Sequence, residues 1–185
     1  LLRIEKVTND TFLKIFDTNL LENTTPLKPN DTNILSSEVK FDFNHEDYNF
    51  TTGFQSYENL QLTNNDRYQY ILPYYNFSKS IIPNFINGSI NLSSSGSNDL
   101  HSTNKLKTRV TNDLSYSSLD FFSNSGFKNN FTLNIKNLNS LGKNVSGYKS
   151  NPQIELSSIF GINSSYPLRK KTLNHLNHLT PKISF

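Results

Sequence analysis

Two small clusters contain side chains that bind metals or move protons in other proteins. His175 and His178 are three residues apart, a spacing at which two ligands can share one face of a helix. In a strand the same separation places them on opposite faces, and no further carboxylate or histidine lies near them. His45, Glu46 and Asp47 directly follow an alternating segment and are typical of a hairpin loop. We therefore expect exposed loop or strand-end positions, with no metal site and no catalytic site.

Sequence motifs for enzymatic chemistry are missing from the chain. It has no glycine-rich phosphate loop, no nucleophile elbow and no zinc signature, and it contains no cysteine. The 18 Lys and Arg residues are dispersed, the densest group being Arg169, Lys170 and Lys171, and no basic stripe alternates with stacking aromatic residues. We expect no catalytic residue, no cofactor and no nucleic-acid partner.

Three other basic residues share one side of a segment with a period of two. Between residues 105 and 118, Lys105, Lys107 and Arg109 fall on a polar side, whereas Leu106 and Val110 fall on a largely apolar one. The pattern predicts a strand with one polar face. The three basic side chains could line a path for an anionic glycan, and the plainer alternative is that they are ordinary surface charges.

The same alternation organises most of the chain. The other alternating segments are residues 38–43, 48–62, 86–92, 131–136 and 153–160. Turn and loop signals lie at residues 23–33, 64–66, 87–88, 93–99, 124–126, 137–144 and 161–167. Because no helical pattern separates the strands, we expect hairpin connections and an all-β antiparallel meander without an internal domain boundary.

The period does not say which face is buried. A soluble β-sandwich turns its apolar face inward, whereas an outer-membrane barrel turns it toward lipid and encloses a polar lumen. Hydrophobic residues make up only 34% of the chain, which is little for two packed sheets. A Lys or Arg facing lipid at the midplane costs roughly 2–4 kcal/mol, so in a barrel Lys105, Lys107 and Arg109 should face the lumen or lie near a strand end. The pattern favours part of a transmembrane barrel, with the sandwich as the alternative.

The most aromatic stretch, residues 66–77, contains a proline at its middle. Pro73 lacks a backbone donor, so we expect an edge, a bulge or a strand end there, and favour a strand end at the membrane boundary. Tyrosine suits such a boundary because its ring is apolar and its hydroxyl is polar. The residues expected at the membrane interface are Tyr68, Tyr70, Tyr74, Tyr75 and Phe77.

Several segments, in their order and spacing, resemble the barrel domain of LptD, the lipopolysaccharide-assembly protein of the Gram-negative outer membrane, and most of all its alphaproteobacterial branch. The segments are VTNDTFLKIFD at 7–17, YENL at 57–60, DRYQYILPYYNF at 66–77, YPL at 166–168 and LTPKIS at 179–184. The resemblance spans nearly the whole chain and implies that residues 1–185 are a central part of that barrel.

The resemblance implies a function in transport without covalent chemistry. Lipopolysaccharide would arrive over a periplasmic bridge, its sugar part would cross the lumen, and its lipid would leave sideways into the outer leaflet of the outer membrane. An LptE-like lipoprotein would plug the lumen. The alternation of Leu179, Ile183 and Phe185 also resembles the end of a complete barrel. A truncated LptD-like barrel is preferred, because the LTPKIS segment resembles an internal part of such barrels. The alternatives are a porin-like channel and a soluble or secreted β-sandwich binding module.

Overall fold

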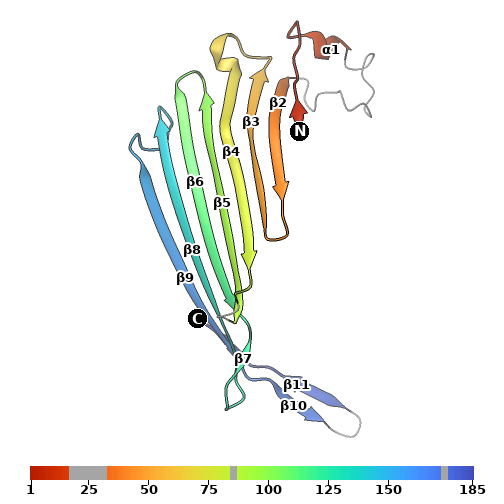
Figure 1. Cartoon of the computed structure of the whole chain (residues 1–185), viewed down its shortest axis with the longest axis vertical. Helices are drawn as coiled ribbons and strands as arrows, with labels where there is room; N and C mark the ends of the chain where they lie inside the picture. The colour runs from red at the N-terminus through yellow and green to blue at the C-terminus, as the bar shows by residue number, and fades with distance from the viewer. Residues whose placement is uncertain (17–32, 84–86, 172–174) are drawn as a thin grey trace.

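The protein forms one antiparallel sheet in which strands that follow each other in the sequence lie side by side (Figure 1). The computed structural model describes residues 1–16, 33–83, 87–171 and 175–185. Its long strands are β2 (Ile34–Asn44), β3 (Tyr48–Asn59), β4 (Tyr68–Ile81), β5 (Gly88–His101), β6 (Lys105–Ser118), β8 (Lys128–Lys143) and β9 (Gln153–Ser165). The expected all-β antiparallel meander is confirmed.

Shorter elements lie at the edges and ends of this sheet. They are β1 (Leu2–Arg3), α1 (Phe12–Phe16), the 3-10 helix η1 (Asn64–Arg67), β7 (Phe121–Phe122), β10 (Leu168–Lys171), β11 (Leu176–Leu179) and β12 (Lys182–Ser184). β1 pairs with β2, β7 with β8, and β12 with β9, whereas β10 and β11 form a separate hairpin. Among the described residues, no helix is long and apolar enough to cross a membrane.

The strands are longer than the sequence pattern predicts. Residues 93–99 and 137–143, predicted as loops, lie inside β5 and β8, and residues 161–165 belong to β9. Serine and asparagine are tolerated there because both neighbouring strands pair with the backbone along these stretches. In contrast, β3 ends at Asn59, before the predicted end at residue 62. Residue 86 of a predicted strand and residues 23–32 of a predicted loop lie outside the described residues.

Pro73 lies within β4, so the preferred assignment to a strand end is wrong. The register of β4 shifts between Ile71 and Tyr74 against β5, and between Gly53 and Gln55 against β3. Leu72 and Pro73 thus occupy a bulge in an interior strand. A bulge relaxes the local pairing and so tolerates the missing backbone donor.

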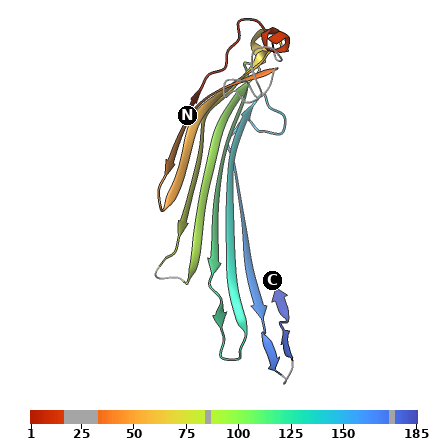
Figure 2. The same cartoon turned by 90° about the vertical axis from the view of Figure 1, so that its right-hand side faces the viewer.

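The sheet is a single curved layer (Figure 2). In the described residues, buried apolar side chains are limited to Leu13, Leu35 and Leu60, which pack near the N-terminal segment together with Val7. The accessible surface is 13614 Å² for a mass of 21.2 kDa, whereas a compact monomer of this mass exposes roughly 9,000 Å². The described residues thus lack a core that could cover the sheet.

Both outer strands keep long stretches of unpaired backbone within the described residues. On β9, β12 pairs only with Asn163, Ser164 and Ser165, and two further bonds join Ile162 to Phe185. On β2, β1 pairs with Glu38 and Val39, and two further bonds join Lys40 to Leu1. Unpaired strand edges need a partner strand or a cover, because free N–H and C=O groups attract other strands.

A cluster of charges fastens the N-terminal segment to the turn between β3 and β4. The Arg67 guanidinium lies 2.8 Å from a carboxylate oxygen of Asp10 and 2.7 Å from one of Glu58. The hydrogen bond to Asp10, opposed by partial burial and reinforced by the charge of Glu58, raises the pKa of Arg67. This cluster holds the segment before α1 against one end of the sheet.

Candidate functional site on the polar face of the sheet

The two faces of the sheet differ in chemistry. Directly opposed residues of antiparallel strands share a face, so the strand register assigns each side chain to one of them. We call the face that carries Glu38, Asn76, Ser95, Thr111 and Ser140 the polar face. The opposite, apolar face carries mainly aliphatic and aromatic side chains: Val39, Phe41, Phe54, Phe77, Leu92, Leu114, Leu133 and Phe160.

Lys105, Lys107 and Arg109 all lie on the polar face, as their spacing predicts. Lys105 is opposite His101, and Lys107 is opposite Asp99. Their surroundings differ, because the ammonium group of Lys107 lies 5.1 Å from the centre of the Tyr148 ring. The structure brings the three residues onto one surface but gives each a different environment.

Arg109 lines a hollow of about 460 Å³. The other side chains at this hollow are uncharged and mostly carry hydroxyl or amide groups, as do Gln55, Tyr74, Asn76 and Ser97, whereas Ile71 is apolar. Within the described part of the chain, Arg109 is a member of no ion pair. A guanidinium among neutral polar groups suits an anionic, hydroxyl-rich ligand, because it can donate two parallel hydrogen bonds to a carboxylate or phosphate.

Tyr74 belongs to a hydrogen-bonded cluster beside this hollow. Its hydroxyl donates to a Glu38 carboxylate oxygen at 2.7 Å, and the side-chain amide of Gln55 donates to the same oxygen at 2.8 Å. The Tyr74 ring packs over Gly53, where a Cβ atom would lie 2.8 Å from the Tyr74 hydroxyl oxygen. These contacts hold the Tyr74 ring against the polar face of the sheet.

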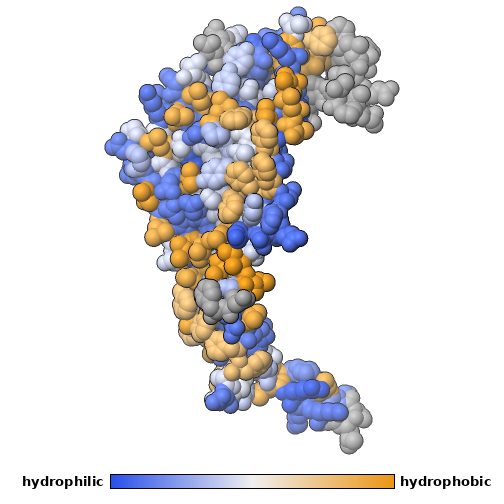
Figure 3. Space-filling model, viewed as in Figure 1, coloured by the Kyte–Doolittle hydropathy of each residue, from blue (hydrophilic) through white to orange (hydrophobic). Residues whose placement is uncertain are grey.

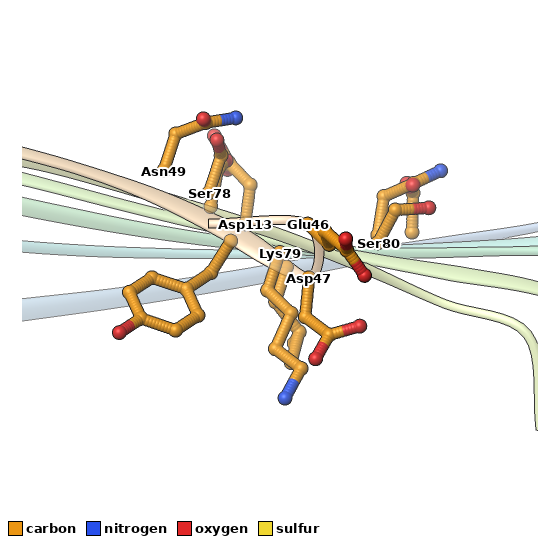
Figure 4. Close-up of a pocket in the computed structure, with 12 residues that line it drawn as sticks. Glu46, Asp47, Asn49, Ser78, Lys79, Ser80 and Asp113 are labelled. Carbon is orange, nitrogen blue, oxygen red and sulfur yellow. The ribbon is translucent and has the colours of Figure 1, made fainter. Parts of the chain in front are cut away.

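A second hollow, of about 340 Å³, lies at the turn between β2 and β3. Figure 4 shows Asn49, Ser78 and Asp113 on one side of the strands and Lys79 and Asp47 on the other. The hollow therefore reaches from the polar face around the end of the sheet. Asp113 is compensated by a partner on the neighbouring strand, the Lys136 ammonium group at 3.6 Å.

The remaining chemistry-bearing residues lie at turns and strand ends. His45 and Asp47 form the predicted β2–β3 hairpin turn, in which the Asp47 backbone N–H donates to His45 Nδ1 at 3.2 Å. His178 pairs with Arg169 in the β10–β11 hairpin, and His175 directly precedes β11. No group of three potential metal-binding His, Cys, Asp or Glu residues occurs in the described ranges.

The five aromatic residues expected at a membrane interface lie on both faces. Tyr68, Tyr70, Tyr75 and Phe77 share the apolar face, whereas Tyr74 lies on the polar face and binds Glu38. Sequence reasoning missed this separation because the bulge at Leu72 and Pro73 breaks the period of two. It also missed further aromatic contacts on the apolar face, between Phe43 and Phe50, Tyr48 and Phe77, and Phe131 and Phe160.

Sequence comparisons assign the chain to no known group. No family model matches it, and no curated protein matches it.

Proposed function

We propose that this chain is part of the wall of an outer-membrane β-barrel of the LptD type, which assembles lipopolysaccharide into the outer leaflet. The polar face lines the lumen and the apolar face contacts lipid. The observation that carries this proposal is the bare apolar face: Phe41 is 50% exposed, Phe160 59% and Ile154 76%. In Figure 3, apolar residues gather in patches along β2 and over the lower part of the sheet.

A soluble protein would cover such a face with a second layer of structure, because each sheet must bury its apolar side. The described residues provide no such layer. Lipid meets the requirement, and the two open edges fit the same arrangement, because a barrel wall pairs its edges with further strands.

The charges are distributed as a lipid-facing wall requires. Lys40, Asp42, Arg109, Asp113 and Lys136 share the polar face. On the apolar face, Lys79 and Lys143 lie close to strand ends, where a charge facing lipid costs about 0–1 kcal/mol against roughly 2–4 kcal/mol at the midplane. The hollow at Arg109 lies along the polar face, and the hollow at the β2–β3 turn opens partly onto it, which supports the assignment of this face to a water-filled lumen.

The step from barrel to lipopolysaccharide assembly rests on the resemblance to LptD and on the basic residues of β6. In this function Lys105, Lys107 and Arg109 attract the anionic sugar part of lipopolysaccharide. An LptE-like lipoprotein occupies the lumen, a periplasmic bridge supplies the substrate, and no covalent chemistry takes place.

Charge reversal at all three β6 residues tests the transport function. In the complete protein, Lys105→Glu, Lys107→Glu and Arg109→Glu together should lower lipopolysaccharide export while the protein still inserts into the outer membrane. The matched control reverses Arg169, Lys170 and Lys171, which form an equally basic group in the separate β10–β11 hairpin. Normal export by the triple β6 variant would reject the role of these residues. A complete protein that stays soluble without detergent would reject the barrel.

A porin-like channel is the second candidate, favoured by the neutral hydroxyl and amide lining around Arg109. The two functions differ in conductance. A purified porin-like barrel forms an open pore for small solutes in a planar bilayer, whereas a barrel plugged by a lipoprotein conducts only after its partner is removed. Steady conductance in the presence of every co-purifying partner would therefore favour the channel.

A further inference from the structure

A group of polar side chains lies in the middle of the apolar face. We call it the polar island; its members are Ser94, Asn98, Thr108, Asn112, Asn137 and Asn139. Apolar residues surround it on the same face: Leu92, Leu114 and Ile135 toward one end of the strands, Leu100, Leu106 and Leu141 toward the other, and Phe77 and Leu156 at the sides. The island therefore interrupts a surface that otherwise suits hydrocarbon.

Side-chain hydrogen bonds connect the island across the sheet. Ser94 donates to Asn112 at 2.7 Å, and Asn112 donates to Asn137 at 3.1 Å. Asn137 in turn donates to the backbone oxygen of Glu155 at 3.2 Å, and the Tyr75 hydroxyl lies 3.1 Å from that of Ser94. The chain of bonds extends from β4 to β9, so the island is an organised feature of this surface.

The island also shortens the apolar surface where it occurs. On β9 the apolar-face positions from Ile154 to Ile162 are interrupted only by Ser158, a length of roughly 27 Å at 3.4 Å per residue. On β6, the same single interruption, here at Asn112, leaves a stretch from Val110 to Tyr116, about 20 Å by the same rise. A lipid-facing band is about 25 Å tall, so β9 matches the bilayer and β6 falls short of it.

Contact with hydrocarbon is unfavourable for the polar island. Each amide has two N–H donors and two acceptor sites, and Asn112 is exposed, so its remaining hydrogen-bonding capacity faces the surroundings. An amide without a partner in an apolar medium costs about 1–3 kcal/mol in proteins. Because the island residues already bind one another, they need no partner of matched shape, only a medium that hydrates the groups left over.

We propose that lipid head groups and water reach down the wall to the polar island, so that the bilayer is thinned beside β5 and β6 and has its full thickness beside β9. This inference rests on the proposed barrel function, because it assumes that the apolar face contacts lipid. A bilayer adapts to a short apolar stretch by thinning, at a cost of fractions of a kcal/mol per Å.

Single nitroxide labels test the depth of the surface, and the lack of cysteine in the chain makes such labelling simple. The complete protein in phospholipid vesicles carries a label at Val110, which lies within the island, at Leu156, which shares the cross-strand row of Asn112 on β9, or at Ser115 on the polar face. Accessibility to oxygen, which concentrates in hydrocarbon, is compared with accessibility to a water-soluble nickel complex.

We expect the nickel-to-oxygen accessibility ratio to be several-fold higher at Val110 than at Leu156. Oxygen-dominated relaxation at both sites would overturn the inference, because the island would then face hydrocarbon. Protection of Val110 from both reagents would also overturn it, because protein would then cover the island. If the Leu156 label is reached by the nickel complex and not by oxygen, the membrane-barrel proposal itself fails.

A filled island provides the second test. Ser94→Ala, Asn112→Leu and Asn137→Leu together replace polar groups with apolar ones and should move the Val110 label into an oxygen-rich environment, while the Leu156 label stays unchanged. An unchanged Val110 ratio in this variant would show that the polar side chains do not set the local thickness. The comparison of wild-type Val110 and Leu156 labels decides the inference even where the filled variant folds poorly.

Discussion

The two faces of the sheet differ in how many of their side chains have partners among the described residues. On the polar face, several charges have partners among the described residues, as between Lys40 and Asp42 at 3.0 Å and between Lys136 and Asp113 at 3.6 Å. On the apolar face, large side chains such as Phe41 and Phe160 stay half exposed or more. The polar face thus contains much of its own pairing, whereas the large apolar side chains of the other face are left uncovered by the described residues.

Adjacent residues of β6 provide the strongest test of this difference. Leu114 lies on the apolar face and Ser115 on the polar face. If the apolar face contacts lipid as proposed, Leu114→Arg should destabilise the protein in vesicles by up to the roughly 2–4 kcal/mol of a midplane site, and by less where the bilayer is thinned beside β6. Ser115→Arg should change stability far less, because its charge would face the polar side. Urea unfolding of the complete protein from phospholipid vesicles measures both effects. Equal losses in the two variants would contradict the assignment of the faces.

Each face also has a glycine under a tyrosine, and the two glycines differ in what surrounds them. For a Cβ atom on Gly96, on the apolar face, the three nearest atoms all belong to the Tyr75 ring. A Cβ atom on Gly53, on the polar face, would collide with the Tyr74 ring and, more closely, with the backbone oxygen of Val39. The nearest contact is therefore a removable side chain at Gly96 and backbone at Gly53.

Gly96→Ala and Gly53→Ala should each cost about 1–3 kcal/mol of unfolding free energy through overpacking. In double-mutant cycles, Tyr75→Ala should remove most of the cost at Gly96, whereas Tyr74→Ala should leave most of the cost at Gly53. Full rescue of Gly53→Ala by Tyr74→Ala would show that the sheet can shift its backbone away from the new methyl group.

The sequence predicts much of this architecture, and its failures share one cause. Alternation identified the strands, the meander and the common face of Lys105, Lys107 and Arg109, because these depend only on a period of two. It failed where polar residues occupy both faces of a strand. Residues 93–99 and 137–144 have the composition of loops, yet most of them lie in β5 and β8, where cross-strand bonds such as that from Asn112 to Asn137 satisfy the side chains.

The bulge in β4 is a second feature that a period of two does not predict. The bulge at Leu72 and Pro73 adds one residue, so the residues after it face the side opposite to the one that the alternation before it predicts. Tyr74 therefore lies on the polar face beside Glu38. Proline signals that pairing is interrupted, but it does not distinguish a bulge from a strand end. That choice depends on whether both neighbouring strands continue, which is a property of the whole sheet.

The charge cluster at the N-terminal segment should have a smaller effect than either face. Asp10→Asn removes one of the two carboxylates around Arg67, whose side chain is 19% exposed. We expect a loss of about 0.2–1 kcal/mol, since Asp10 is half exposed and its ion pair is screened by water and salt. Chemical unfolding at low and high salt measures this loss. An effect that does not weaken at high salt would show that the contact is not mainly electrostatic.

Asp120, in the connection between β6 and β7, should give the smallest effect, and one that depends on pH. Hydrogen bonds from Lys128 and Asn130 lower the pKa of its carboxyl group from the ordinary value of 3.8. The folded state therefore favours the charged carboxylate, so its contribution to stability is complete above that ordinary value and disappears as the pH falls through the lowered one. Asp120→Asn should remove this acid-side loss without changing the response of the other carboxylates. Carboxyl NMR titration of the folded protein measures the pKa directly, and an unshifted or raised value would contradict the contacts seen between Asp120 and β8.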